Sequence, residues 1–156
     1  MAQNTKHVDH VFWICKLENQ ERYVRQLAAI CDTEFHGPVD RPDLGTRIYL
    51  SWRCGLEVIA PLEETTIYSK PLKDQLAARG EGLLGVIFGV VDIEEARKRA
   101  IQLGYSVSPL IENAGHEPYI GETEVMKEIM VGEFMNSTLV FGEIRYAKGV
   151  AHIVGD

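Results

Sequence analysis

Glu57 is the residue whose type and surroundings point most directly to chemistry. It follows Leu56 and precedes Val58 and Ile59, in a run that alternation predicts to be a strand. A carboxylate in an apolar strand is costly unless it is paired, protonated or bound to a metal. The sequence therefore predicts that Glu57 has a partner and takes part in ligand binding or catalysis.

His10, on the first predicted strand, is the candidate partner of Glu57. His7 and His10 are spaced as HxxH, but an odd separation on a strand points the two rings to opposite faces, so they cannot share one ion. Two interpretations of His10 stay open. It is either a hydrogen-bonded histidine of the core or a ring that contacts a ligand or transfers a proton, as imidazole does near neutral pH.

Aromatic side chains form the second group of candidates. Phe12 shares the predicted face of His10, and Trp52 and Phe141 stand on other predicted strands. Aromatic residues on strands ordinarily belong to the core. If the face of His10 lines a cavity, Phe12 and Phe141 would suit that cavity to a hydrophobic or aromatic small molecule.

A long loop at residues 113–123 carries two more candidates, His116 and Tyr119. Its Gly, Asn and Pro content predicts turns rather than a strand or a helix. The loop is long enough to close over a ligand as a lid, and an ordinary surface loop is the alternative.

A first series of elements positions His10 and Glu57. Residues 8–16 predict a strand that is apolar on both faces, and Asn19 predicts the N-cap of an amphipathic helix. After a looser strand, residues 47–52 and 55–60 predict two further strands.

A second series follows a linking helix predicted at residues 69–80. Residues 83–91 predict a strand, and Asp92 predicts the N-cap of a helix that ends at Gly104. Three further strands are predicted at residues 105–111, 125–134 and 138–146.

The second series repeats the order of the first. One β-α-β-β-β unit cannot bury both faces of its sheet, whereas two such units can pair. The predicted fold is α+β: a single domain over residues 1–156, built from βαβββ modules at 7–62 and 83–147 with a linking segment at 63–82. The open faces of the two sheets would form a cup-shaped mixed sheet able to hold a small ligand.

Composition restricts the class of partner. The 156 residues are 46% hydrophobic and 25% charged, as expected of a globular domain. The net charge of −7 and the lack of a basic stripe argue against nucleic acid, and no apolar run approaches the ~18 residues of a membrane span. A polar start without a signal-peptide core, and three cysteines without a CxxC pattern, predict a cytoplasmic protein with buried thiols.

Several stretches resemble the vicinal oxygen chelate superfamily, which includes glyoxalase I, methylmalonyl-CoA epimerase, extradiol dioxygenases and bleomycin-resistance proteins. The likeness is strongest to the epimerase and glyoxalase I branch and covers nearly the whole chain. It rests on Val-Asp-His-Val at 8–11, Gly-Leu-Glu-Val-Ile-Ala-Pro at 55–61, Gly-Glu-Gly-Leu-Leu-Gly-Val-Ile-Phe at 80–88 and Val-Val-Asp-Ile-Glu-Glu-Ala at 90–96. The resemblance implies the two-module cup, a homodimer, and a divalent metal held by one residue from each of four strands.

The resemblance implies an incomplete metal site here. His10 and Glu57 match the first two ligands, but Gly85 stands where the third, a histidine, is normal. The fourth aligns with Phe141, with Glu143 two residues further. Glu143, Glu133 and His116 are the possible replacements.

Two protein ligands hold a divalent ion weakly, so the favoured expectation is a cavity without metal. The alternative is Mg, Mn, Co, Zn or Fe on His10, Glu57 and Glu143.

Two functions follow from the resemblance. The first is a glyoxalase-like isomerase or lyase, in which Glu57 or His10 moves a proton next to a carbonyl. The second is a protein of bleomycin-resistance type that binds or sequesters a small molecule without chemistry. Extradiol dioxygenase activity ranks third, because it needs a second histidine that is missing at Gly85.

Overall fold

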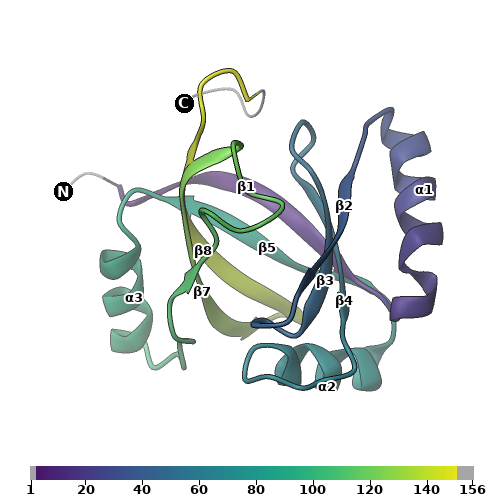
Figure 1. Ribbon diagram of the computed structural model, residues 1–156. Coiled ribbons are helices and arrows are strands. Elements are labelled where there is room, and N and C mark those ends of the chain that lie inside the picture. Colours follow the sequence, from purple (N-terminus) through teal and green to yellow (C-terminus); the bar gives the residue numbers. More distant parts are fainter. Residues whose placement is uncertain (1–2, 151–156) are drawn as a thin grey trace. The chain divides into compact units, whose positions relative to one another are not determined.

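The computed structural model describes residues 3–150, and its elements follow the predicted order (Figure 1). Each half of the sequence contributes one strand, one helix and three strands, with a further helix between the halves. The strands are β1 (Thr5–Ile14), β2 (His36–Arg41), β3 (Thr46–Ser51), β4 (Leu56–Pro61), β5 (Gly82–Val90), β6 (Ile111–Glu112), β7 (Thr123–Phe134) and β8 (Ser137–Tyr146). The helices are α1 (Gln20–Cys31), α2 (Ser69–Arg79) and α3 (Ile93–Gln102), with a 3-10 turn η1 (Leu17–Asn19) before α1. The predicted α+β class is confirmed.

The chain forms two compact units whose limits differ from the two sequence modules. Phe12–Leu84 make up one, here called the α1 unit. The described residues before Phe12 and from Gly85 onward make up the other, the α3 unit. β1 and β5 therefore each contribute residues to both units.

In the α1 unit, β2, β3 and β4 form an antiparallel sheet that continues to the end of β1. The backbone N–H of Cys15 donates to the carbonyl of Ile59 over 3.1 Å. Helix α1 covers one face of this sheet. The buried residues of that face form a core of Cys15, Val24, Tyr49, Val58 and Ala60. Alternation then turns the intervening side chains of β3 and β4 away from α1.

In the α3 unit, the strand order is β1-β5-β8-β7-β6. β5 and β8 run parallel, and β7 and β8 form a long antiparallel hairpin. Met135 and Asn136 turn this hairpin with φ values of 47° and 66°. Helix α3 covers one face, where the buried core is Val90, Ile93, Ala96, Ala100, Ile129 and Val131.

The two predicted helix caps have different outcomes. The carboxylate of Asp92 accepts hydrogen bonds from the backbone N–H groups of Glu94 and Glu95, so the predicted N-cap of α3 is confirmed. Asn19 does not cap α1: it has helical backbone angles after η1 and makes no side-chain cap bond. Its amide instead donates to Glu81 over 2.8 Å.

The predicted strand at residues 105–111 is wrong over most of its length. Only Ile111–Glu112 pair as a strand. Pro109 has no N–H to give to a ladder, and the hydroxyl of Ser108 takes the N–H of Met130. Together these interrupt the pairing with β7.

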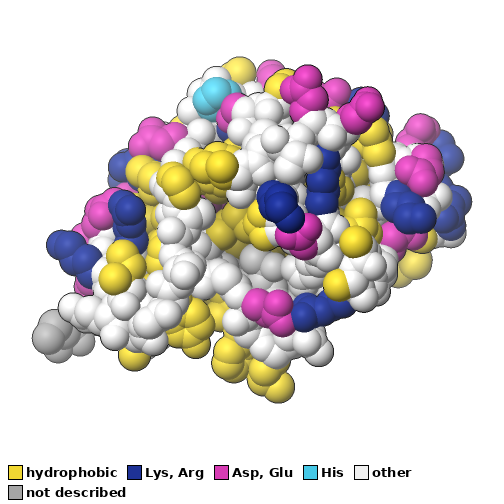
Figure 2. All heavy atoms as spheres, turned by 90° about the horizontal axis from the view of Figure 1, so that it is seen from below, with side chains coloured by type: hydrophobic (Ala, Val, Ile, Leu, Met, Phe, Trp, Pro, Cys, Tyr) yellow, Lys and Arg dark blue, Asp and Glu magenta, His cyan; other side chains and the backbone are white. Residues whose placement is uncertain are grey.

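Within residues 3–150 no helix is long and apolar enough to cross a bilayer. Figure 2 shows acidic and basic side chains interspersed over the visible face. That face offers no continuous basic surface of the kind that tracks phosphates.

Candidate functional site

Glu57 lies on β4 and is 8% exposed. It stands directly opposite the buried Leu50 of β3. The neighbouring pair Tyr49 and Val58 packs against α1, so Glu57 and Leu50 occupy the face of the sheet away from that helix. The predicted strand position and burial of Glu57 are both observed.

His10 is also buried, in the α3 unit, and it contacts its chain neighbour Asp9. His10 Nδ1 lies 2.7 Å from Asp9 Oδ1, and the same oxygen accepts the hydroxyl of Tyr146 over 2.7 Å. His10 and Asp9 are 4% and 5% exposed. The sequence could not reveal this contact, because adjacent residues of a regular strand point to opposite faces.

The ionisation of Asp9 determines that Nδ1 of the His10 imidazole carries a proton. Burial alone would raise the pKa of Asp9, but the hydrogen bonds from His10 and Tyr146 and the charge of His10 hold it below its ordinary value. An ionised Asp9 can only accept, so Nδ1 of His10 carries the proton. In the neutral ring the basic nitrogen is then Nε2.

A third buried carboxylate, which sequence reasoning missed, is Glu128 on β7. Glu128 and Asn113 are 9% and 1% exposed, and Asn113 Nδ2 donates to Glu128 Oε2 over 2.6 Å. Glu128 stands between Ile111 of β6 and Gly142 of β8, on the sheet face away from α3. The available signal was its position two residues from both Met126 and Met130, which makes it a carboxylate on an apolar face.

Phe141 and Glu143 lie on the opposite face of β8. Phe141 packs against the α3 core, with its ring 6.3 Å from that of Phe88. Glu143 Oε2 accepts the N–H of Ile93 over 3.2 Å at the start of α3. The sequence alignment puts Phe141 at the fourth ligand position and on the face of a cavity, and the structure places it on the face of β8 that packs against α3.

The remaining candidates occupy different surroundings. Phe12 is buried, and alternation with Cys15 turns it away from α1. Trp52 lies in the turn after β3 and is half-buried. His116 is exposed, whereas Tyr119 is 3% exposed.

Backbone hydrogen bonds within the loop that carries His116 and Tyr119 fix its conformation. The N–H of His116 donates to the carbonyl of Asn113 over 3.1 Å, and the N–H of Tyr119 donates to that of His116 over 2.7 Å. These bonds make the segment a series of tight turns.

The residues described do not fit the metal site that the resemblance implies. Within residues 3–150 no three His, Cys, Asp or Glu side chains come together as a set of metal ligands. Gly85 lies on β5 and has no side chain, and Glu143 is engaged at the start of α3. Catalytic zinc sites usually have three protein ligands, and the described residues do not supply such a set.

Solved structures, but no sequence families, resemble this chain. No family model and no curated protein matches it. Methylmalonyl-CoA epimerase from Mycobacterium tuberculosis superposes with a TM-score of 0.65 at 15% identity, over 94% of this chain and 93% of that one. A hypothetical protein from Bacillus halodurans C-125 has a TM-score of 0.64 at 19% identity, over 90% and 94% of the two chains.

A Streptomyces coelicolor methylmalonyl-CoA epimerase in complex with 2-nitronate-propionyl-CoA has a TM-score of 0.63 at 15% identity, over 88% of this chain and 96% of that one. Likeness at such identities establishes fold and not activity. The element order, the two βαβββ series and these superpositions agree. The chain has the α+β fold of the vicinal oxygen chelate superfamily, to which the epimerases belong.

Proposed function

We propose that this protein is a glyoxalase-like isomerase or lyase that moves a proton on the carbon next to a carbonyl group. The observation that carries the proposal is the Asp9–His10 pair, a buried imidazole oriented through Nδ1 by an ionised carboxylate. This arrangement prepares Nε2 as a base and stabilises the imidazolium after it takes a proton.

The proposed step follows ordinary enolisation. The base takes the proton from the carbon next to the carbonyl, the C–H electron pair forms a C=C bond, and the carbonyl π pair moves to oxygen as an enolate. Return of the proton to the other side gives an isomer, and loss of a β leaving group with its electron pair gives the lyase product. His10, Glu57 and Glu128 are the candidate proton carriers, and Asp9 is a positioning residue.

The similar solved structures support an acyl thioester as the first compound to test. One of them is a methylmalonyl-CoA epimerase in complex with methylmalonyl-CoA and NH4+, with a TM-score of 0.64. In that ligand the carbonyl activates the neighbouring C–H bond. A small acyl thioester is therefore our proposed substrate class.

The test is hydrogen exchange in deuterated water. Methylmalonyl-CoA is incubated with the protein, and deuterium at the carbon next to the carbonyl is measured by mass spectrometry. We expect exchange, and a loss of about 10²–10⁴-fold in the His10→Asn and Glu57→Gln variants, since positioned acid–base groups contribute that much. Glu18→Gln, an exposed carboxylate, is the matched control. Equal exchange in all four proteins, or none above buffer with this thioester and with the hemithioacetal of methylglyoxal, would reject the proposal.

A binding protein without chemistry is the second candidate. The lack of a three-residue metal-ligand set within residues 3–150 favours it, because an enolate then has no metal to stabilise it. Glu57→Gln separates the two functions. Turnover lost at unchanged affinity supports the enzyme, and weakened binding of a hydrophobic ligand without any turnover supports the binder.

The resemblance also leads us to propose a homodimer. Light scattering coupled to size-exclusion chromatography gives the mass directly. A mass near the 17.5 kDa of one chain would reject the dimer.

A further inference from the structure

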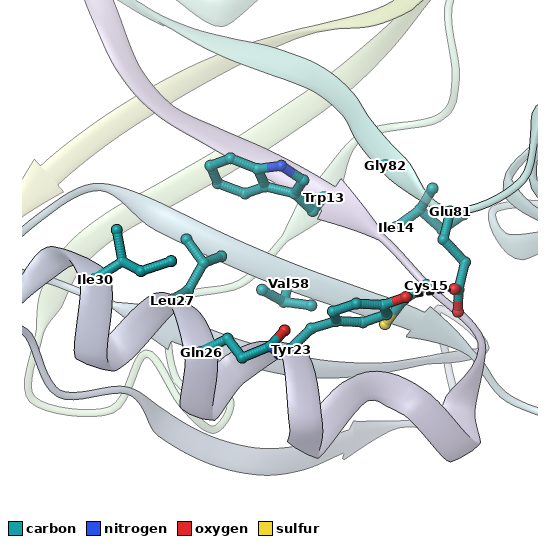
Figure 3. A pocket seen from close by; sticks show the side chains of 10 residues that line it. All are labelled: Trp13, Ile14, Cys15, Tyr23, Gln26, Leu27, Ile30, Val58, Glu81 and Gly82. Carbon is teal, nitrogen blue, oxygen red and sulfur yellow. Dashed lines mark hydrogen bonds between the residues drawn. The ribbon is translucent and has the colours of Figure 1, made fainter.

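A pocket between α1 and the strands that it covers is lined by none of the residues proposed for proton transfer. It opens within the α1 unit, between α1, the end of β1 and the start of β5, and has a volume of about 290 Å³ (Figure 3). At ~30 Å³ per water molecule, this is room for a ligand of roughly ten non-hydrogen atoms. His10, Glu57 and Glu128 are not among its lining residues.

Most of the residues that line the pocket are apolar, and some of them are exposed to solvent. Trp13 and Leu27 are half-buried, and Ile30 is 82% exposed. Figure 3 shows the Trp13 ring facing Leu27 and Ile30 across the pocket. The thiol of Cys15 is also apolar in character, because burial raises its pKa to about 12 and keeps it neutral. An apolar ligand would remove this surface from water.

One end of the pocket carries a fixed carboxylate, that of Glu81. Its Oε1 accepts the backbone N–H of Lys16 and the amide of Asn19, each over 2.8 Å. Its Oε2 accepts the hydroxyl of Tyr23 over 2.8 Å. Burial would raise the pKa of Glu81, but these hydrogen bonds hold it below its ordinary value.

The carboxylate keeps room for one more donor. A carboxylate has about four acceptor sites, and the described residues fill three of those of Glu81. The fourth is on Oε2, which accepts the Tyr23 hydroxyl. The strongest donor for it is a charged one.

The positive charges already near Glu81 and Tyr23 repel a bound ammonium group only weakly. The ring of Tyr23 already carries the guanidinium of Arg22, 4.4 Å from its centroid. The other nearby positive charge, the side chain of Lys16, is exposed, so water and salt screen it.

We propose that this pocket binds a small primary amine with one apolar ring or branched chain. The ammonium group donates to Oε2 of Glu81, and the apolar body lies against Trp13 and Leu27. The site is independent of the proposed proton transfer and stands whether or not that activity is found.

Intrinsic fluorescence tests this directly. The chain has two tryptophans, so Trp52→Phe leaves Trp13 as the reporter inside the pocket. The probes are 2-phenylethylamine, 2-phenylethanol and 3-phenylpropionate, which share a body and differ in charge. We expect a saturable change with the amine at a Kd on the order of 10 µM to 1 mM, as befits about nine atoms. The alcohol should bind at least tenfold more weakly, and the acid more weakly still.

Two variants assign the interactions. Glu81→Gln should weaken amine binding about tenfold and leave the alcohol unchanged, whereas Glu18→Gln, an exposed carboxylate outside the lining, should change neither. Leu27→Ala should weaken both probes and preserve their ratio, which gives a second test if Glu81→Gln fails to fold. Equal affinity for amine and alcohol, an effect of Glu18→Gln equal to that of Glu81→Gln, or no saturable binding would each overturn the proposal.

Discussion

The α1 unit and the α3 unit each bury a carboxylate on the sheet face away from the helix, but on different strands. In the α1 unit it is Glu57 on β4, opposite Leu50. In the α3 unit it is Glu128 on β7, opposite Gly142. The two units therefore share the sheet face that carries a buried carboxylate, but the two carboxylates do not align when one half of the sequence is compared with the other. In a fold built from two similar halves, candidate functional residues are better found by asking which sheet face they occupy than by aligning the two halves.

The largest expected effect contrasts the two faces of the α3 unit. Glu128→Gln should reduce the proposed exchange reaction by about 10²-fold or more, since it removes a candidate acid–base group. Glu143→Gln, on the face that packs against α3, should stay within about twofold of the parent. Deuterium incorporation by mass spectrometry measures both. If Glu143→Gln were the damaging change, the distinction between faces would be broken.

The next effect contrasts the two cores. Ile129 is 0% exposed and sits at the centre of the α3 core, so Ile129→Ala should cost about 2–5 kcal/mol of unfolding free energy. Val58→Ala, in the α1 core, removes fewer carbons and should cost less. Urea unfolding followed by circular dichroism gives both values. A smaller loss for Ile129→Ala than for Val58→Ala would contradict the packing described.

Acid dependence sharpens the role of Asp9, the carboxylate that accepts from His10 and Tyr146 in the α3 unit. Because the pKa of Asp9 in the folded protein lies below its ordinary value of 3.8, the stabilisation from Asp9 is present above that pH and is lost as pH falls through the folded pKa. Asp9→Asn should cost about 1–3 kcal/mol at pH 7. The difference from the parent should shrink below pH 3.8.

Unfolding free energies measured from pH 7 to pH 2 test this. Tyr146→Phe, which removes one hydrogen bond to Asp9, should show a smaller loss with the same pH trend. A difference that grows on acidification would show that Asp9 is not held ionised.

The smallest effect compares the starts of α1 and α3. Asp92→Ala removes an N-cap and should cost about 1 kcal/mol. Asn19→Ala removes a hydrogen bond to Glu81 but no cap, so the helix itself should lose less. Thermal melts compare the two variants. An equal drop in Tm for both variants would contradict the expectation that the cap of α3 stabilises the protein more than the Asn19 contact at α1.

Sequence patterns within a few residues predicted most of the fold. The positions of the candidate site residues depended on contacts between segments that are distant in the sequence. Alternation and the Asp92 cap are readable within a few residues, and the elements they indicate are present except for most of the strand predicted at residues 105–111. The register of β7 and β8 is set by a turn with positive φ at Met135 and Asn136, which alternation alone does not locate. That register decides that Phe141 faces α3 and Glu128 does not.

The contact between His10 and Asp9 was unpredictable for another reason. Both belong to one strand, and their side chains meet against the pattern of alternation. The burial of Glu57, by contrast, followed from the apolar residues around it in the sequence.

The division of β1 between the two units affects the order in which the chain can fold. Thr5–Val11 belong to the α3 unit, which resumes along the chain at Gly85. During synthesis this segment emerges before β5, and the residues between them must be made before that neighbouring strand exists. Until then it is an unpaired edge able to associate with other nascent chains. The ribosome must complete β5 before the first strand of this protein has both of its neighbours.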